Sequence, residues 1–597
     1  MNYYKKVQKG EIKMFDKIVY MNDSYIFVNL SENADIRVNM LNLHVAIIDS
    51  EKALLGEIEE LNNRQLKIRL LGEFVNGKLN SGVIRKPLLD ARIRSLRTEE
   101  LPLILGFNQK DTLLLGESPY YSNSKVYSDI NKLLGHHFAI FGNSGSGKSC
   151  GLARILQNIF ENKNAYPYKA NFILFDISGE YTTAFRNLNA INPNYNYRIF
   201  TTNKFSGYGE QLRIPLWLLN SNDIALLLMC NSHSQLPIIE QMLKLTKIFA
   251  ENDEDSIKIK NHLIAKAMLS VIYSNQSAAN KRNDIFSIVE TCGTNEFDLE
   301  TEVQGVGYTR KFRDCFLINK SGEFSESILV TDYISGFIND EYDNYEPKDN
   351  VTYTLLDMEK ALNFALISES WFKNENSYND ASTIKVRLHS LITGKYFDIF
   401  NYKEFVTTEE FLTNMLIDNN KRYQLVNINL DDVDDSMASV ITKIFTRIIF
   451  DFSKSLPERA SLPFHILIDE AHRYIKNDSD NYLLGFNIFE RVAKEGRKYG
   501  VLLGIISQRP VELSDTVISQ ISNFIIFKTN HPRDLEYLKQ MIPNISSDII
   551  DKQKALQAGT ALAFGAAFNI PLMIRFDKPN PMINAENCNV TKSWGNE

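Results

Sequence analysis

The chain has 597 residues, of which 44% are hydrophobic and 23% are charged, and its formal net charge is −7. This composition excludes a disordered, collagen-like or low-complexity protein, and the length corresponds to several domains of roughly 150 residues each. The negative charge argues against a protein that coats nucleic acid through its average field, although a local patch could still bind. The five cysteines are far apart, so we predict neither a disulfide framework nor a CxxC metal site.

The start of the chain is polar and rich in lysine, without the apolar centre of a secretory signal. The best apolar run, Ile224 to Cys230, is far too short to span a bilayer. We therefore expect a cytoplasmic protein in a reducing compartment, with no membrane partner.

Residues 1–116 are predicted to form a small N-terminal β-barrel. From about Asp16 onward, short runs of β-branched and aromatic residues alternate with Asn, Gly, Ser and Asp, which is typical of short strands joined by turns. The stretch from Arg85 to Arg97 carries five positive charges against one negative charge. A solvated strand or turn face explains this stretch better than a binding surface, because most charge runs simply face water.

Residues 117–220 and 422–575 are predicted to form the two parts of one α/β core. Several short apolar runs there end at polar residues, as strands do when helices cover both faces of a parallel sheet. Helices are expected between them, at Met437–Lys454 and Phe489–Gly500. Between the two parts, residues 221–421 lose this alternation and read as a mainly helical insertion with an acidic, exposed connection at 338–350. Residues 576–597 are expected to be a C-terminal strap or tail.

The segment GNSGSGKS, Gly142 to Ser149, matches the phosphate-loop pattern GxxxxGK[ST]. Glycines let backbone N–H groups turn toward phosphate, Lys148 would reach the β- and γ-phosphates, and the Ser149 hydroxyl would bind magnesium. The apolar strand before the loop and the helix after it favour a site for ATP and Mg²⁺ over a simple glycine-rich turn. The predicted nucleotide-binding residues are Gly142, Asn143, Ser144, Gly145, Ser146, Gly147, Lys148, Ser149 and Cys150, the last of these as a small packing residue.

An acidic pair follows the apolar strand Ile466–Ile468. In such a site Asp469 would complete the magnesium shell, and Glu470 would act as the base that polarises the attacking water. A helix start is the alternative for an acidic pair at a strand end, and the phosphate loop makes the catalytic interpretation the stronger one.

Polar residues follow two further strands. Gln508 follows a third core strand and would sense the γ-phosphate. Asp176 and Glu180 follow the second core strand, at the sheet edge where α/β ligand sites form, and either support the site or cap a turn.

A phosphoryl-transfer site also needs a cation near the γ-phosphate, often supplied by another subunit. Arg497 is our candidate for this role, with Arg491 in reserve. Helical spacing places Arg491, Lys494 and Lys498 on one face, and the alternative is that this face is merely solvated.

Seven ordered segments resemble the HerA ATPases of the FtsK–HerA superfamily. They are GHHFAIFGNSGSGKS, DISGEY, LRIPLWLL, ILIDEAHRYI, EGRKYG, SQRP and GTALAFGAAFNIPLMIRFDKPNP. DISGEY differs from the commoner DPHGEY, since Ile177 and Ser178 replace proline and histidine. DEAH also spells the signature of a separate helicase class, but the other motifs of that class are missing.

The resemblance implies a RecA-like P-loop core behind a small β-barrel, and a homohexameric ring that uses ATP to move along double-stranded DNA in its central pore. It implies roles for Lys148 and Ser149 as nucleotide ligands, Asp469 and Glu470 as the magnesium and catalytic acids, Gln508 as sensor and Arg497 as the finger acting in trans. It also implies an effector partner, a nuclease or a sirtuin-like NAD hydrolase, docked on the N-terminal barrel.

Two alternatives stay open at this point. The ring could be an ATP-regulated scaffold that assembles and activates an effector without moving DNA, or, less favoured, a secretion or conjugation motor. Charge alone leaves Arg310, Lys311 and Arg313 as candidates for contacting DNA. Because the net charge is negative, DNA is expected inside a pore rather than across an open basic face.

Overall fold

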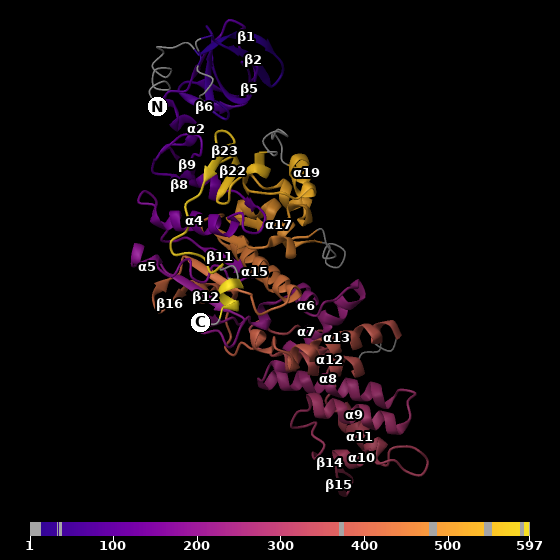
Figure 1. Cartoon of the computed structure of the whole chain (residues 1–597). Coiled ribbons are helices and arrows are strands. Elements are labelled where there is room, and N and C mark those ends of the chain that lie inside the picture. The colour runs from indigo at the N-terminus through magenta and orange to yellow at the C-terminus, as the bar shows by residue number, and fades with distance from the viewer. Residues whose placement is uncertain are drawn as a thin grey trace.

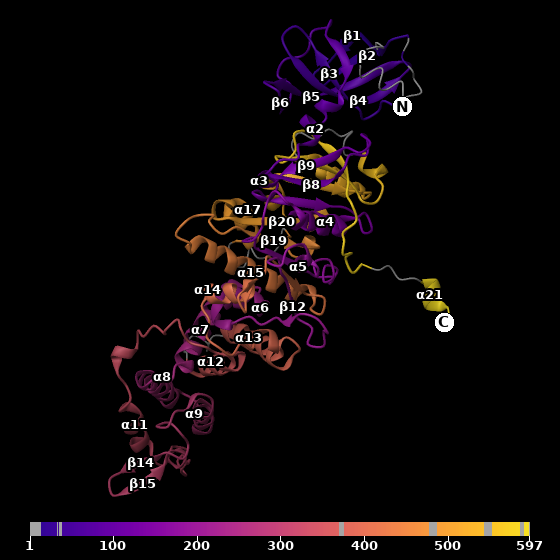
Figure 2. The same ribbon diagram turned by 90° about the vertical axis from the view of Figure 1, so that its left-hand side faces the viewer.

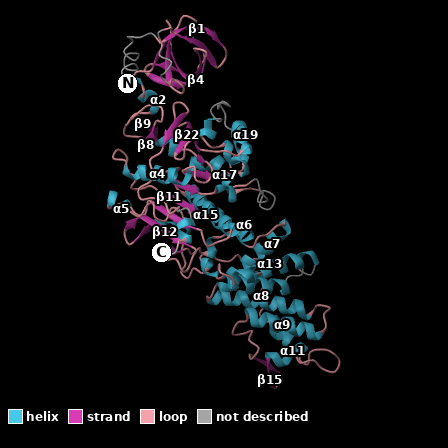
Figure 3. Ribbon diagram, in the orientation of Figure 1, coloured by secondary structure: helices cyan, strands magenta, loops and turns pink. Residues whose placement is uncertain are grey.

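The computed structural model describes residues 14–32, 34, 39–368, 375–476, 486–541, 552–585 and 590–595. The molecule is elongated: an antiparallel sheet lies at one end, a mixed α/β body in the middle and an arm of helices at the other end (Figures 1 and 2). Figure 3 shows that most strands lie in the first two parts and that the arm is nearly all helix.

The N-terminal sheet is antiparallel and curled, with strand order β1-β2-β5-β4-β3-β7 and β6 paired to β5. Alternate residues face its interior, and Ile26, Val28, Leu66 and Ile68 are fully buried there. The strand pairings run from β1 to β7, and these two end strands lie against each other. The described residues thus form a curled antiparallel sheet, and the small β-barrel that the sequence predicts stays a prediction. The strands are β1 (Phe15–Met21), β2 (Tyr25–Leu30), β3 (His44–Ile48), β4 (Ala53–Asn62), β5 (Gln65–Val75), β6 (Lys78–Ser81) and β7 (Arg92–Ser95).

The central body is built on a twelve-stranded mixed sheet, in the order β13-β12-β18-β11-β19-β20-β10-β21-β22-β23-β8-β9. The strands from β13 to β21 are parallel, and the rest are antiparallel. Strand β8 spans the predicted boundary at residue 116 and belongs to this sheet. The strands are β8 (Thr112–Glu117), β9 (Lys125–Asp129), β10 (Phe138–Phe141), β11 (Phe172–Asp176), β12 (Tyr197–Thr201), β13 (Glu210–Gln211), β18 (Leu425–Asn429), β19 (Phe464–Ile468), β20 (Val501–Ser507), β21 (Asn523–Phe527), β22 (Thr560–Gly565) and β23 (Leu572–Arg575).

Helices cover both faces of this sheet, which explains the continuous apolar runs of its strands. Strand β10 shows the division: Ala139 and Phe141 pack in the cluster that contains α15 (Asp435–Ser455) and α17 (Ile488–Glu495). Phe138 and Ile140 pack on the other face, with α4 (Lys148–Glu161). The mixed α/β fold that the sequence predicts is therefore confirmed for the body.

The arm lies between β13 and β18 along the chain and consists mainly of helices. The acidic connection 338–350 lies along these helices and is tied to them by ion pairs, such as Lys244–Glu346 and Lys266–Asp343 at 2.9 and 2.7 Å. The elements of the arm are α6 (Ser221–Leu227), α7 (Leu236–Ala250), α8 (Glu254–Ile272), α9 (Ala278–Cys292), β14 (Glu302–Gly305), β15 (Tyr308–Lys311), α10 (Phe312–Cys315), α11 (Ser327–Ser335), α12 (Leu355–Ser368), α13 (Glu375–Thr393), α14 (Thr408–Leu416), β16 (Ile417–Asp418) and β17 (Lys421–Arg422).

The remaining described elements are short and connect the larger ones. They are α2 (Pro102–Leu105), α3 (Ile130–Leu134), α5 (Leu188–Ile191), α18 (Asp515–Ser519), α19 (Pro532–Met541), α21 (Val590–Trp594), and the 3-10 turns η1 (Thr98–Glu100), η2 (Leu216–Leu218), η3 (His233–Gln235), η4 (Asp340–Tyr342), η6 (Phe397–Phe400), η7 (Ala471–Arg473), η8 (Gly496–Tyr499), η9 (Pro510–Glu512) and η10 (Lys552–Ala555).

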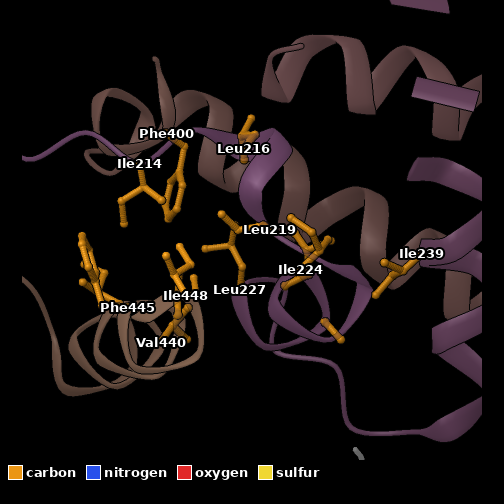
Figure 4. Packing of buried hydrophobic residues seen from close by; sticks show 14 of the residues in the cluster. Ile214, Leu216, Leu219, Ile224, Leu227, Ile239, Phe400, Val440, Phe445 and Ile448 are labelled. Carbon is orange, nitrogen blue, oxygen red and sulfur yellow. The ribbon is translucent and has the colours of Figure 1, made fainter. Parts of the chain in front are cut away.

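The body and the arm share one hydrophobic core where α6 packs on α15. Figure 4 shows side chains of α6 and of residues 214–219 facing those of α15, including Phe445 and Ile448. The carboxylate of Asp434 caps α15 by accepting from the Met437 N–H at 2.9 Å, which fixes where this helix begins. The base of the arm is therefore held by apolar packing against the body.

We expect Leu227→Ala to destabilise the body, because Leu227 is only 2% exposed and the deletion leaves a cavity in this shared core. The expected loss is about 2–5 kcal/mol in the free energy of unfolding, measured by urea denaturation. The matched control is Leu356→Ala on α12, where the side chain is 46% exposed and the loss should stay below about 0.5 kcal/mol. Equal losses for the two variants would contradict the packing described here.

Candidate active site

The phosphate loop connects the carboxyl end of β10 to the start of α4, in the middle of the sheet. Two of its glycines are required by close approach as well as by conformation. Gly142 has φ +158°, and a Cβ there would lie 2.7 Å from the Cβ of Phe527. Gly147 has φ +104°, and its Cβ would lie 2.9 Å from the backbone nitrogen of Gly559. No other residue type fits these two positions without a shift of the backbone.

Backbone hydrogen bonds hold the loop from both sides. The Asn143 N–H donates to the Lys528 carbonyl at 3.0 Å, and the Gly559 N–H donates to the Ser146 carbonyl at 2.9 Å. At the tip Ser144 and Gly145 are exposed. The Ser146 hydroxyl is buried and has no hydrogen-bond partner among the described residues. A buried hydroxyl without a partner is able to donate a hydrogen bond to a phosphate oxygen of a bound nucleotide.

Lys148, the first residue of α4, is only 5% exposed and points at two carboxylates. Its ammonium lies 2.8 Å from Glu470 Oε1 and 3.4 Å from Asp469 Oδ1. Burial alone would lower the pKa of Lys148, but the charges of Asp469 and Glu470 outweigh it and raise the pKa above its ordinary value. The lysine is therefore charged and fixed at the mouth of the loop.

Asp469 and Glu470 follow β19, which lies two strands away from β10, with β20 between them. The sequence predicts that these acids meet Lys148, and the structure brings all three side chains together. Burial raises the pKa of Asp469 to about 6, against the pull of Lys148. Glu470 has φ +46°, a left-handed conformation that is costly for a residue with a Cβ. This strained turn directs its carboxylate back over the loop.

The oxygen atoms around Asp469 suit a hard cation that also binds the phosphates of a nucleotide. The Asp469 Oδ2 atom is buried and has no hydrogen-bond partner among the described residues, so one carboxylate oxygen is left for a ligand. Ser149 lies beside the lysine on α4, and the buried hydroxyl of Tyr181 faces both Ser149 and Asp469. The described residues contain no group of three or more His, Cys, Asp and Glu side chains that could hold a metal alone. Oxygen ligands from Ser149, Asp469 and a nucleotide suit magnesium, which seldom has an all-protein cage.

The turn after β11 is built around Asp176, which is fully buried. Its carboxylate accepts from the N–H groups of Glu180 and Tyr181 at 3.0 and 2.9 Å, and from the amide of Asn427 at 3.1 Å. Burial, followed by the charge of Asp469, raises the pKa of Asp176 to about 7. Asp176 thus holds the turn, while the charge of Glu180 acts on Lys148. Asp176 therefore corresponds to the capped turn that the sequence offers as one alternative, and Glu180 to the other alternative, an acid close to the nucleotide site.

The end of β20 is linked to the catalytic candidates through a histidine. The Nδ1 atom of His472 lies 3.3 Å from Glu470 Oε2 and 3.2 Å from the hydroxyl of Ser507, the last residue of β20. Gln508 follows directly and is half-buried. The predicted sensor is therefore adjacent in the chain to a serine that contacts the same histidine as Glu470.

Arg497 lies at the opposite edge of the sheet from the loop. It is exposed on η8, and its charge acts on His136 and His137, which precede β10. Roughly 13 Å of strand, four residues of about 3.3 Å each, separates that end of β10 from the loop. Within one chain Arg497 and Lys148 are not brought together.

The reserve candidate, Arg491, packs its guanidinium over the rings of Phe450 and Phe486, at 5.6 and 5.8 Å. Helix α17 ends at Glu495, so Lys498 lies on η8 and not on the helical face that the sequence predicts for Arg491, Lys494 and Lys498. The 3-10 turn there is followed by Gly500, at φ +79°, which ends the helical run.

The three basic residues of the arm that the sequence leaves as candidates for a DNA contact are paired with acids. Arg310 contacts Glu326 at 3.3 Å, and Lys311 contacts Glu300 at 2.6 Å; Arg313 also contacts Glu300. All three lie at or just after the β14–β15 hairpin, at the end of the arm away from the body (Figure 1). We therefore do not assign them to a DNA contact.

Sequence reasoning missed four residues that shape the site: Phe527, Gly559, Asn427 and Tyr181. Phe527 and Gly559 come from the far end of the chain and touch the loop glycines only because β21 and β22 are neighbours in the sheet. No local signal marks Phe527, and Gly559 is marked only as the first residue of the segment GTALAFGAAFNIPLMIRFDKPNP. Tyr181 stands inside DISGEY and could have been noticed, since an aromatic residue directly after a polar turn at a strand end is either exposed or faces a site.

Together these residues define a P-loop nucleotide site with an acidic pair, able to bind a nucleoside triphosphate and a divalent cation.

The family model for the central domain of helicase HerA matches residues 113–302. The DNA double-strand break repair helicase HerA of Sulfolobus acidocaldarius is 32% identical over 171 residues, which is 28% of this chain and 34% of that protein. Its counterpart from Saccharolobus solfataricus is 25% identical over 303 residues, 44% of this chain and 60% of that protein.

A probable helicase of Methanocaldococcus jannaschii is 23% identical over 474 residues, covering 78% of this chain and 70% of that protein. Among solved structures, VirB4 of Thermoanaerobacter pseudethanolicus aligns with a TM-score of 0.42 at 13% identity, over 79% of this chain and 98% of that chain. The chain spans only about a third to three fifths of the HerA helicases named above.

The site and the matched central domain place a P-loop nucleotide site in this chain. Its residues 113–302 are similar to the central domain of the HerA helicases, in agreement with the resemblance that the ordered motifs of the sequence predict. Within the part of the chain that the structure describes, no helix is long and apolar enough to cross a membrane.

We expect Gly147→Ala to weaken nucleotide binding at least about tenfold, because the new Cβ meets Gly559 and the φ angle disfavours any side chain. The measurement is titration with a fluorescent ATP analogue. Gly207→Ala is the matched control, since its Cβ would meet nothing within 4 Å. An unchanged affinity for Gly147→Ala, in a variant that unfolds at the wild-type temperature, would contradict this account of the loop.

Magnesium-dependent nucleotide binding should weaken as the pH falls from 7 to 5. The pKa of Asp469 is raised from 3.8 to about 6, so this carboxylate takes up a proton as the pH falls through 6 and then no longer binds a cation. The expected loss approaches about tenfold per pH unit below 6. Nucleotide binding without magnesium is the control and should change less, while Asp469→Asn should bind weakly at every pH. A magnesium effect that is constant from pH 7 to 5 would argue against Asp469 as the ligand.

Proposed function

We propose that this chain hydrolyses ATP and uses the energy to move along double-stranded DNA as a homohexameric ring. The observation that carries the proposal is the buried group formed by Lys148, Asp469 and Glu470, with one oxygen of Asp469 left for a cation. Its HerA-like central domain, shared with proteins named as DNA repair helicases, supports DNA as the substrate. The four cysteines that the structure describes are all free, which supports a reducing compartment such as the cytoplasm.

Each side chain of the site has a place in hydrolysis. Lys148 would transfer from the two carboxylates to the β- and γ-phosphates, and Glu470, released from the lysine, would accept a proton from the attacking water. Ser149 and Asp469 would hold Mg²⁺, which supplies charge neutralisation on the phosphates when bound. The exposed backbone N–H groups at Ser144 and Gly145 would donate to the phosphates.

Two features support a catalytic Glu470 over a simple helix start. The residue adopts a left-handed conformation, and such strain persists where the surrounding structure fixes a functional side chain. His472 contacts its second oxygen and links it to the end of β20, beside Gln508. Loss of the γ-phosphate would thus be transmitted to Gln508 through Glu470, His472 and Ser507. This path agrees with the sensor role that we propose for Gln508.

The position of Arg497 is an argument for a ring-shaped assembly of several copies. An arginine that stabilises the transferred phosphoryl group has to reach the γ-phosphate, and Arg497 lies across the sheet from its own loop. It could therefore act only on the nucleotide of a neighbouring copy, which requires an assembly with repeated head-to-tail contacts. Arg491 is less suited to this role because it packs on Phe450 and Phe486.

A second function is favoured by the surface of the N-terminal sheet. Several large apolar side chains are exposed at this end of the molecule: Val19 and Tyr20 on β1, and Ile84, Leu88 and Leu89 in the connection between β6 and β7, with Ile84 at 92%. Exposed apolar side chains mark protein interfaces when they are grouped. The ring could therefore also assemble and activate an effector, a nuclease or a sirtuin-like NAD hydrolase, docked on this sheet in DNA processing or anti-phage defence.

The test of ATP hydrolysis in trans is subunit mixing. Lys148→Met should abolish nucleotide binding, and Arg497→Ala should lower ATP hydrolysis about 10³-fold. Mixed with each other, the two inactive variants should regain part of the wild-type rate, because a Lys148→Met subunit still offers its arginine to an Arg497→Ala neighbour. Lys494→Ala, an exposed cation on the adjoining helix, is the control and should hydrolyse ATP at the wild-type rate.

The DNA component is tested separately, by ATPase assays with double-stranded DNA at several salt concentrations and by the mass of the assembly in solution. We expect hydrolysis to rise with DNA and the rise to fade with salt, as backbone contacts do. A monomer whose hydrolysis ignores DNA would falsify the translocase proposal. Hydrolysis without DNA stimulation in an intact ring would instead favour the scaffold function.

A further inference from the structure

A short segment, residues 552–559, touches both the N-terminal sheet and the phosphate loop. It begins with η10 and runs into β22. Its first residue contacts the sheet, its second contacts β21, and its last contacts the loop. We call residues 552–559 the strap; it is a different segment from the C-terminal residues 576–597. Each of its three contacts is a specific polar interaction.

The contact with the sheet is a partly buried ion pair. Lys552 Nζ lies 2.9 Å from Oε1 of Glu57 on β4, and Arg69 on β5 lies 3.2 Å from the other carboxylate oxygen. Burial would raise the pKa of Glu57, but the surrounding positive charges, with that of Lys552 among them, hold the pKa below its ordinary value. The pair borders a cavity of about 20 Å³ between the sheet and strands β22 and β23. Removing Lys552 leaves Glu57 with Arg69 as its remaining cationic partner, and removing Glu57 leaves Lys552 without its carboxylate at this contact.

The contact with β21 is made by the next residue, Gln553, which is fully buried. With its amide nitrogen turned toward β21, it donates to the carbonyls of Ile526 and Phe527 at 3.1 and 3.0 Å. Phe527 is the residue that Gly142 approaches, and its ring also packs against Phe576 at 5.4 Å. Gln553 thus fixes the end of β21 on which the loop rests.

The contact with the loop is made by Gly559, which donates its N–H to Ser146 at 2.9 Å and accepts from the Phe576 N–H at the same distance. The backbone of Gly559 also leaves no room for a Cβ at Gly147. A displacement of the strap would therefore move an atom that binds the loop directly. The path from Glu57 to Ser146 runs along one chain segment, from Lys552 to Gly559.

We propose that Lys552 and Gln553 are positioning residues that couple the N-terminal sheet to the nucleotide site. A protein docked on the sheet would act through the Glu57–Lys552 pair and the strap on the affinity of the loop for nucleotide. This coupling rests on the proposed function, since it presupposes nucleotide binding at Gly142–Ser149. By reciprocity, a nucleotide in the loop would alter the affinity of the sheet for its partner by the same factor.

The experiment measures the Kd of a fluorescent ATP analogue and the KM and kcat of hydrolysis for Glu57→Gln, Lys552→Met and the double variant. Each single variant should weaken binding about 3- to 10-fold and raise KM in step, with kcat within about twofold because Lys148 and Glu470 are untouched. The double variant should resemble the single ones, since both remove one pair. Gln553→Leu should weaken binding at least as much.

Two controls separate coupling from general damage. Lys554→Met changes an exposed lysine on the same turn and should leave Kd unchanged. Lys552→Arg keeps the charge and should restore binding to within about twofold of wild type. Variants that unfold at lower temperature yet keep the wild-type Kd and KM would overturn the coupling and leave a purely structural contact.

The failure of the proposed function has a different signature. A wild-type chain that binds no ATP analogue would overturn that function and the coupling with it. A wild-type chain that binds the analogue, together with additive or absent effects of Glu57→Gln and Lys552→Met, would overturn the coupling alone.

Discussion

The structure depends on one buried electrostatic arrangement: an ammonium group held between two carboxylates at the carboxyl edge of a parallel sheet. Lys148 and Asp469 are each at most 5% exposed, and such charges are stable only while they compensate one another. The lysine comes from a helix and the acids from a strand two positions away, so the arrangement exists only when the sheet is assembled in register. A phosphate that takes over the lysine also frees the acids for a cation and for water. The same contact thus stabilises the empty site and prepares it for its substrate.

Much of the site could be predicted from the sequence because its key residues sit in local patterns. The loop glycines and Asp469 follow apolar strands, Lys148 begins the helix after the loop, and the parallel sheet brings strand ends to one edge. Gln508 and the Asp176 turn follow the same rule. The strap and Phe527 could not be predicted, because their contacts depend on which strands are neighbours, and nothing near Lys552 indicates an acid almost five hundred residues earlier.

The fold was predictable to a similar degree. The alternation of apolar strands and helices predicts the α/β body, and α15 and α17 lie where their apolar periodicity places them. Strand patterns predict a small β-barrel at the N-terminus, but they could not give the order in which the strands of the curled sheet pair. The extent of α17 was also missed, since helical spacing continues past Glu495 in the sequence while the backbone tightens into a 3-10 turn before Gly500.

The chain re-enters the body close to where it leaves it. The Ile214 N–H donates to the Ile399 carbonyl at 2.6 Å, and Arg447 on α15 contacts Asp223 at the start of α6. The arm is thus an insertion whose first and last residues are held next to each other by contacts within the body. Lengthening, shortening or exchanging its outer helices would add little loop entropy and would leave the strand order intact. Related chains could therefore differ widely in this region while sharing one catalytic centre, which would make the arm a natural place for specialisation.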